Sequence, residues 1–137
     1  MQVNRREVII AATTSAITGL LVGCADNDAA PGFNPVPAGA TVDIGTSEEY
    51  PHDGKYYQFL NRGIVLTRLN GNLSAMSAVC THRRCALNLE TDGSYHCKCH
   101  GSTFDAAGKV TEGPAKRDLP MLAIVTSNAG KLLVQSK

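Results

Sequence analysis

The chain has 137 residues, which is enough for one domain with a single modest hydrophobic core. Its 13 lysine and arginine residues nearly balance 12 acidic residues, so the charge does not point to nucleic acid or to an acidic substrate. The chain has no tryptophan and only 5% aromatic residues, which also argues against a stacking surface for nucleic acid bases.

Residues 1–23 have the layout of an export signal. Arg5 and Arg6 precede an uncharged run from Val8 to Ala25, and small residues lie near the end of that run. The paired arginines resemble the signal of the Tat pathway, which carries proteins already folded around a cofactor. The Leu-Val-Gly sequence before Cys24 resembles a bacterial lipobox. We therefore expect cleavage before Cys24 and lipidation of this cysteine, which would anchor the protein to a membrane.

An uncleaved N-terminal anchor is the alternative for this segment, although threonines, a serine and glycines in the uncharged run weaken it as a membrane span. Both alternatives place the domain outside the cytoplasm, on the periplasmic or cell-surface side of a membrane. Residues 24–40 are rich in Pro, Gly, Asn and Asp, which predicts a flexible tether. Residues 41–137 would then form the folded domain.

The folded part shows short apolar runs separated by turn signals and no sustained helical period. The clearest pair of runs lies on either side of Asn70-Gly71, a dipeptide typical of a β-hairpin turn. A second pair flanks the Ser-Asn-Ala-Gly sequence at 127–130. Several short strands with glycine-rich turns predict an all-β protein, as an antiparallel sandwich or barrel. The expected strands are residues 41–44, 56–60, 63–69, 73–79, 119–126 and 131–135.

Two short segments, CTHRRC at 80–85 and CKCHGS at 97–102, hold four of the five cysteines and two of the four histidines. Such crowding needs a chemical reason, because a free surface cysteine is an oxidation hazard. A structural zinc site is one alternative, but it leaves the second cysteine of each segment unexplained. Two disulfides are another, but they leave the histidines without a role. The other histidines, His52 and His96, lack such neighbours, so we expect them to be surface or packing residues.

A [2Fe–2S] cluster with mixed ligands uses all of these residues. It needs four protein ligands, and in one type two imidazoles replace two thiolates on one iron. Cys80 and Cys97 could hold one iron, and His82 and His100 the other. One cysteine in each segment would then remain, and an exported protein permits a disulfide between them. These remaining cysteines are Cys85 and Cys99.

The two segments, CTHRRC and CKCHGSTFD, resemble those of the Rieske iron–sulfur proteins. The similarity is to the disulfide-containing branch found in cytochrome bc complexes and related exported bacterial proteins, and it covers roughly residues 41–137. It implies an antiparallel β-sandwich with a small cluster-binding part at about 78–117, one [2Fe–2S] cluster per chain and a Cys85–Cys99 disulfide. Gly113-Pro114-Ala115 resembles the proline loop that covers the cluster on its third side.

The same resemblance implies roles for residues beside the ligands. Ser102 stands where a serine hydroxyl donates to a bridging sulfide, which stabilises the reduced cluster, so we include it in the cofactor site. Phe104 stands where quinol-oxidising members have a tyrosine that donates to a cysteine sulfur. Because phenylalanine cannot donate, this replacement should lower the reduction potential. The general range for such clusters is about −150 to +300 mV. Arg83 and Arg84 replace Leu-Gly; their charge should act in the opposite direction. The missing leucine also removes an apolar contact for docking on a quinol pocket.

The function that the resemblance implies is electron transfer, with no catalytic residue and no independent turnover of this chain. The first interpretation is a subunit or partner of a membrane-associated exported oxidoreductase, such as a molybdenum enzyme, or a free lipid-anchored carrier. The alternative is the Rieske subunit of a quinol–cytochrome c reductase type complex, which works with cytochromes b and c. Its iron-bound histidines would accept the proton of quinol. A third interpretation is the ferredoxin of a dioxygenase system, but those proteins lack the disulfide and the export segment.

Overall fold

The computed structural model describes residues 32–137, so the expected export signal, Cys24 and the first part of the tether lie outside the described residues. Regular structure in the described part consists of β-strands and two single turns of 3-10 helix, with no α-helix. No helix within these residues is long and apolar enough to cross a membrane. The all-β class is confirmed. The elements are β1 (Thr41–Asp43), η1 (Ser47–Glu49), β2 (Gly54–Tyr56), η2 (Leu60–Arg62), β3 (Ile64–Leu69), β4 (Asn72–Ser77), β5 (Asn88–Leu89), β6 (Tyr95–His96), β7 (Thr103–Phe104), β8 (Val110–Glu112), β9 (Met121–Thr126) and β10 (Leu132–Gln135).

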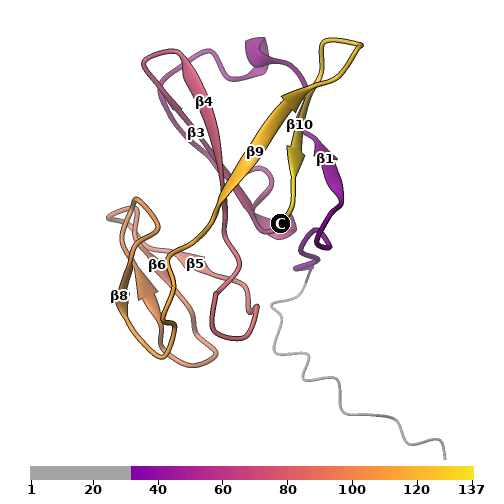
Figure 1. Ribbon diagram of the computed structural model, residues 1–137. Coiled ribbons are helices and arrows are strands. Elements are labelled where there is room, and N and C mark those ends of the chain that lie inside the picture. Colours follow the sequence, from indigo (N-terminus) through magenta and orange to yellow (C-terminus); the bar gives the residue numbers. More distant parts are fainter. Residues whose placement is uncertain (1–31) are drawn as a thin grey trace, which may run out of the picture.

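Six strands form the larger sheet, in the order β1-β10-β9-β4-β3-β2, with antiparallel neighbours throughout. Strand β9 is shared between two arms of this sheet. Its first residues, Met121 and Leu122, pair with β4, whereas its later residues pair with β10. The sheet therefore opens into a V at β9, with β3 and β4 in one arm and β10 and β1 in the other (Figure 1). The first hydrophobic core lies between these arms.

Both hairpins expected from the sequence are present. In the β3–β4 turn, Asn70 and Gly71 have φ values of 50° and 78°, the left-handed conformation that asparagine and glycine adopt most readily. The expected strand at 56–60 is wrong except for Tyr56, because β2 begins earlier and the chain then turns into η2. The apolar side chains that follow Tyr56 are divided between two cores. A run of apolar residues therefore occurs here without a strand.

Residues 34–40, which the sequence assigned to the tether, lie against the domain. The Asn34 N–H donates to the Asn61 carbonyl at 2.8 Å. Val36 is buried in the first core. The packed part of the chain thus begins earlier than Thr41, the residue at which the sequence analysis starts the folded domain. Composition did not reveal this, because the contact depends on one apolar side chain and a few backbone hydrogen bonds.

Strands β3 and β4 separate the two hydrophobic cores. Ile64 and Leu66 face the first core between the arms of the V, whereas Val65 between them faces the second core. In β4, Ala75 and Met76 divide in the same way. The small sheet is attached to the large sheet through this second core. The buried members of the second core are Val65, Met76, Ala78, Cys80, Leu87, Tyr95, Cys97, Phe104, Ala115 and Leu119.

The small sheet has the antiparallel order β5-β6-β7-β8 and lies beside the point of the V (Figure 1). Because its strands run back and forth, the turns at 90–94 and 105–109 share one end of the sheet and residues 97–102 lie at the other. Lys55 of β2 holds the first of these ends against the large sheet, since its Nζ donates to the Ala106 carbonyl at 2.6 Å. The opposite end carries the predicted ligands.

Candidate metal centre

The two segments with the predicted ligands are loops of the same design, which we call the first ligand loop (residues 80–85) and the second ligand loop (residues 97–102). In each, the N–H of the leading cysteine donates to the carbonyl of the last residue, at 2.9 Å in the first loop and 2.8 Å in the second. The carbonyl of the leading cysteine accepts the N–H of the fifth residue, at 2.9 Å in both loops. The fifth residue of each loop has a left-handed backbone conformation, with φ of 61° at Arg84 and 82° at Gly101. Two different sequences therefore close in the same way.

Cys80 and Cys97, the predicted thiolate ligands, are buried together in the second core, each only 1% exposed. Burial and a hydrogen bond with Cys80 raise the pKa of the Cys97 thiol. Backbone N–H groups of Cys99 and His100 donate to the Cys97 sulfur and act in the opposite direction. The Cys97 thiol is therefore protonated at neutral pH without a metal, while its backbone donors are already placed to stabilise a metal-bound thiolate.

His82 and His100, the predicted imidazole ligands, lie on the surface instead. Their ring centroids are 4.8 Å apart and their planes are nearly perpendicular, at 87°. Desolvation, the neighbouring His100 ring and the Arg83 guanidinium lower the pKa of His82. Its ring is therefore neutral at pH 7, which is the form that binds a metal ion.

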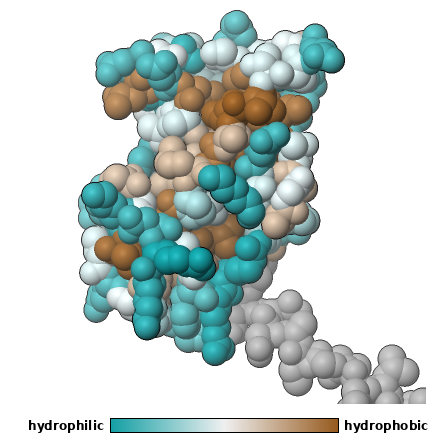
Figure 2. Space-filling view, in the orientation of Figure 1, coloured by the Kyte–Doolittle hydropathy of each residue, from teal (hydrophilic) through white to brown (hydrophobic). Residues whose placement is uncertain are grey.

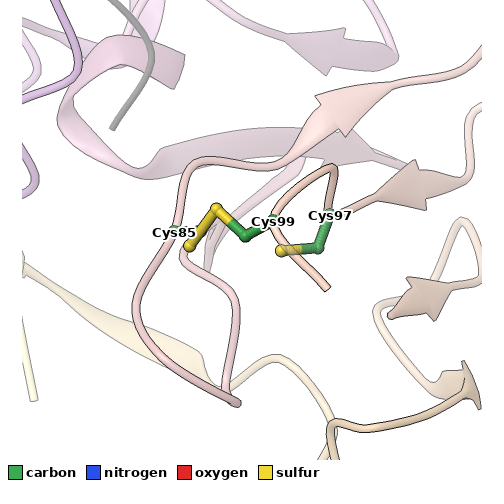
Figure 3. Close-up of side chains that lie close together, drawn as sticks. All are labelled: Cys85, Cys97 and Cys99. Atoms are coloured by element: carbon green, nitrogen blue, oxygen red, sulfur yellow. A yellow bond between two sulfur atoms is a disulfide. The ribbon is translucent and has the colours of Figure 1, made fainter. Parts of the chain in front are cut away.

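A disulfide between Cys85 and Cys99 joins the two ligand loops, with the Cα atoms 6.5 Å apart. The pairing that the resemblance implied is therefore present. Cys97 lies beside this disulfide, and the three sulfur atoms are within 4.8 Å of one another (Figure 3). Disulfide sulfurs are not thiolates, so only Cys97 among these three is available to bind a metal.

Ser102 is completely buried, and its Oγ accepts the N–H of Ala115 at 2.9 Å. Because Ala115 follows Gly113 and Pro114, this bond connects the proline loop to the second ligand loop. Accepting the Ala115 N–H leaves the hydroxyl proton of Ser102 available for donation. The geometry is compatible with the donor role that the resemblance implies for this serine.

We expect Ser102→Ala to destabilise the domain and to lower its reduction potential. The buried N–H of Ala115 would lose its acceptor, which typically costs about 1–3 kcal/mol, and a donor to the reduced cluster would be lost. Denaturant unfolding and a redox titration measure the two effects. Ser127→Ala is the matched control, because its Oγ also accepts a backbone N–H, from Lys131 at 3.1 Å, in the distant β9–β10 hairpin. An unchanged potential in Ser102→Ala would contradict the donor role.

The segment directly after the proline loop contacts the first ligand loop. The Thr81 hydroxyl donates to the Arg117 carbonyl at 2.6 Å. The sequence analysis did not single out Thr81, although a hydroxyl residue between two predicted ligands was the available signal. The segment around Pro114 thus connects to both ligand loops through side-chain hydrogen bonds.

The predicted ligands come as two pairs, with buried thiols and exposed imidazoles. The other two histidines lie elsewhere. His96 Nδ1 is 3.9 Å from Glu90 Oε1, and the backbone N–H of His52 donates to the Tyr56 hydroxyl at 3.1 Å. Two sulfurs and two imidazole nitrogens are the ligand atoms that a mixed-ligand [2Fe–2S] group requires. Backbone N–H groups also donate to one of these sulfurs. The residues therefore fit such a group.

Residues 40–124 match the Rieske [2Fe-2S] domain family. The chain belongs to this family. The domain of this family carries a [2Fe–2S] cluster. The cofactor and the antiparallel fold expected from the resemblance are therefore both present in the family to which this chain belongs.

Relatives of this Rieske domain occur in several proteins. The cytochrome b6-f complex iron-sulfur subunit of Chlorobaculum thiosulfatiphilum is 34% identical over 99 residues, which are 70% of this chain and 53% of that protein. A protein of Haloferax mediterranei that is named as the Rieske subunit of a respiratory nitrate reductase is 42% identical over 62 residues. These are 44% of this chain and 28% of that protein. The crystal structure of the plasma membrane Rieske protein PetC3 from Synechocystis PCC 6803 is 34% identical, covers 69% of this chain and 99% of that chain, and has a TM-score of 0.45. The chain spans about half the length of the Chlorobaculum subunit.

Proposed function

We propose that this protein is a one-electron carrier in which Cys80, His82, Cys97 and His100 hold the cluster. The observation that carries this proposal is the division of the donor set, since both thiols are buried and both imidazoles are exposed. When bound, a [2Fe–2S] group takes up and releases one electron at a time. The buried cysteines would keep water from one side of the site, and the exposed imidazoles offer a redox partner the shortest approach.

The surroundings of the ligands support a carrier held in one geometry. The second core packs behind Cys80 and Cys97, and the disulfide joins the ligand loops. The segment 113–117 makes a hydrogen bond to each of these loops. A site whose atoms move little on electron uptake exchanges electrons with less reorganisation. The exposed imidazoles also have ring nitrogens that can hold a proton at the surface.

We propose that the carrier serves a membrane-associated oxidoreductase outside the cytoplasm, with Cys24 lipidated as its anchor. Relatives support a complex as partner, since they include a cytochrome b6-f complex subunit and a protein named as the Rieske subunit of a respiratory nitrate reductase. Exposed Arg83 and Arg84 favour an oxidoreductase other than a quinol-oxidising complex, because they stand where an apolar docking contact is expected. Mass spectrometry of the N-terminus of membrane-isolated protein tests the anchor: a lipidated Cys24 supports it, and an intact Met1 contradicts it.

The second candidate is the Rieske subunit of a quinol–cytochrome c reductase type complex. It is supported by the similarity to the cytochrome b6-f subunit over 70% of the chain. The disulfide between Cys85 and Cys99 argues against the ferredoxin of a dioxygenase system, whose members lack it.

The test of the carrier function uses the full chain isolated with its iron. We expect one electron per chain in a redox titration, and a reduced-state EPR signal with the low average g value that histidine ligation produces. Added quinol alone should not reduce the protein, whereas fast reduction by quinol would favour the second candidate. Well-folded protein without iron and acid-labile sulfide, or iron that does not change its oxidation state, would overturn the proposal.

We expect Phe104→Tyr to raise the reduction potential. Phe104 is fully buried in the same core as Cys97. The resemblance places an added hydroxyl at this position within reach of a cysteine sulfur. A hydrogen bond of about 1 kcal/mol to the reduced state corresponds to about 40 mV for a one-electron couple. Redox titration measures this shift. Phe59→Tyr, which adds the same hydroxyl beside the first core, is the control and should leave the potential unchanged. A Phe104→Tyr potential equal to or below that of the unmodified protein would contradict the hydrogen-bond account.

A further inference from the structure

Positive charge is concentrated around the two exposed histidines. The ligand loops and the segment 110–118 carry five basic and two acidic residues, whereas the rest of residues 32–137 carries six basic and seven acidic residues. The excess of positive charge in the described chain is therefore confined to the end that holds the predicted ligands. All five basic residues are exposed. They are Arg83, Arg84, Lys98, Lys116 and Arg117.

A disulfide and a hydrogen bond hold the segments that carry these five residues at one end of the molecule. The disulfide joins the loop of Arg83 and Arg84 to the loop of Lys98. The Arg117 carbonyl accepts the Thr81 hydroxyl at 2.6 Å, which keeps Lys116 and Arg117 beside the first ligand loop. The cations thus surround His82 and His100 from three segments of the chain, and we call this set of five the cationic rim.

The side chains of the cationic rim make no ion pair and no side-chain hydrogen bond with other residues of 32–137. Three of the six basic residues elsewhere in 32–137 have partners for their side chains. Lys131 Nζ lies 2.7 Å from Asp43 Oδ2, Arg68 Nη1 donates to Ser47 Oγ at 3.1 Å, and Lys55 Nζ donates to a backbone carbonyl at 2.6 Å. Of the two acids near the rim, Asp118 accepts the Val110 N–H at 2.9 Å with one oxygen. Unpaired cations around a redox site create a positive field that extends over about one Debye length, roughly 10 Å at 0.1 M salt.

The surface at the histidines is polar rather than apolar. The exposed large apolar residues, Leu69, Met121 and Val125, all belong to the larger sheet. On the face drawn in Figure 2, the end with the small sheet and the ligand loops is covered mainly by hydrophilic side chains. Arg84 also occupies a left-handed position, φ 61°, where the second ligand loop has a glycine. Charge rather than apolar area is therefore the main feature that this end offers to a partner.

We infer that the cationic rim is the docking surface for a redox protein with an acidic surface around its own redox centre. The inference rests on the proposed electron-transfer function. Complementary charge orients two proteins before contact and raises the association rate, an effect that salt removes. An acidic partner guided by the rim would meet the imidazole edge first, which is the exposed part of the ligand set.

The test compares two probes with the same haem, native cytochrome c with its basic surface and cytochrome c whose lysines have been succinylated. Stopped-flow mixing with reduced, iron-loaded full-length protein gives the rate of electron transfer to each. We expect the rate with the succinylated form to fall about tenfold or more between roughly 10 and 200 mM ionic strength, and the rate with the native form to rise or stay constant. Calorimetry with the oxidised proteins supplies a readout that does not depend on electron transfer, and should show salt-sensitive binding of the succinylated form alone.

The rim is tested with Arg83→Gln/Lys98→Gln and a control double variant, Arg68→Gln/Lys109→Gln. Both remove two positive charges, but Arg68 lies near the β3–β4 turn and Lys109 in the turn at the opposite end of the small sheet. We expect the rim variant to lose severalfold in low-salt rate and affinity for succinylated cytochrome c, and the control variant to retain both.

Four outcomes would count against the inference or its basis. Equal salt dependence for both probes, or equal losses in the two double variants, would overturn the docking surface while the carrier function stands. Rim-dependent binding to phosphatidylglycerol vesicles, without rim-dependent binding of succinylated cytochrome c, would assign the rim to a membrane and also overturn it. Failure of reduced, EPR-active protein to pass electrons to either probe would count against the carrier function itself.

Discussion

Cys97→Ser and His100→Ala are each expected to abolish the reduced-state EPR signal. Cys97 is buried beside Cys80 and receives N–H donors at its sulfur, so serine would place a weaker, less readily ionised ligand there. His100 is in edge contact with His82, at 4.8 Å between centroids, and with the proposed ligands its loss would leave a single imidazole to hold one iron. We expect iron and acid-labile sulfide to fall by about tenfold or more, since losing one of four ligands removes a large part of the binding free energy.

The matched control for His100→Ala is His96→Ala. His96 lies in the adjacent strand β6, is partly exposed and faces Glu90, so its removal should leave iron content and EPR unchanged. Cys80→Ser and His82→Ala complete the set and should behave like their counterparts. A full EPR signal with unchanged g values in any of the four ligand variants would reject that residue as a ligand.

Removing the disulfide with Cys85→Ala/Cys99→Ala is expected to lower the free energy of unfolding by about 3 kcal/mol. The bridge closes a loop of 14 residues, and a closure of this size restricts the unfolded chain by roughly that amount. It is also the covalent connection between the two ligand loops. We therefore expect the variant to lose its iron faster than the unmodified protein when a chelator is added.

Stability and iron release are measured separately, by denaturant unfolding of metal-free protein and by absorbance after chelator addition. The control is Ser94→Ala/Ser127→Ala, which changes two exposed or half-buried polar positions in turns away from the ligand loops. If the cysteine variant releases iron at the unmodified rate, the disulfide has no part in holding the loops. If its unfolding free energy is also unchanged, the bridge contributes nothing to the fold.

Local signals in the sequence were sufficient for the elements that depend on neighbouring residues. Asn70-Gly71 predicted the β3–β4 turn because these residues adopt positive φ at low cost, and the structure has that turn. The strand expected at 56–60 failed for a reason that is not local. Tyr57 and Leu60 pack against the second core and Tyr56 and Phe59 against the first, so the apolar run serves two cores instead of one sheet face.

The chemistry of the site was also readable from short spacing. CTHRRC and CKCHGS are two segments of six residues that carry the predicted ligands and the disulfide cysteines. Their resemblance to Rieske proteins led to the correct family and to the Cys85–Cys99 pairing. Thr81 was missed, because its bond to the Arg117 carbonyl joins positions 36 residues apart. The packing of residues 34–40 was missed for the same reason.

The amino-acid sequence by itself determined the hairpin turns, the family and, through the family, the [2Fe–2S] cofactor, because each is encoded by residues close together in the chain. Tertiary structure alone decided that the thiols are buried and the imidazoles exposed, and that Arg83, Lys98 and Arg117 gather at one end. Burial depends on which distant strands pack on a residue. Here β3 and β4 present one face to each core, and the second core covers Cys80 and Cys97 while leaving His82 and His100 at its edge.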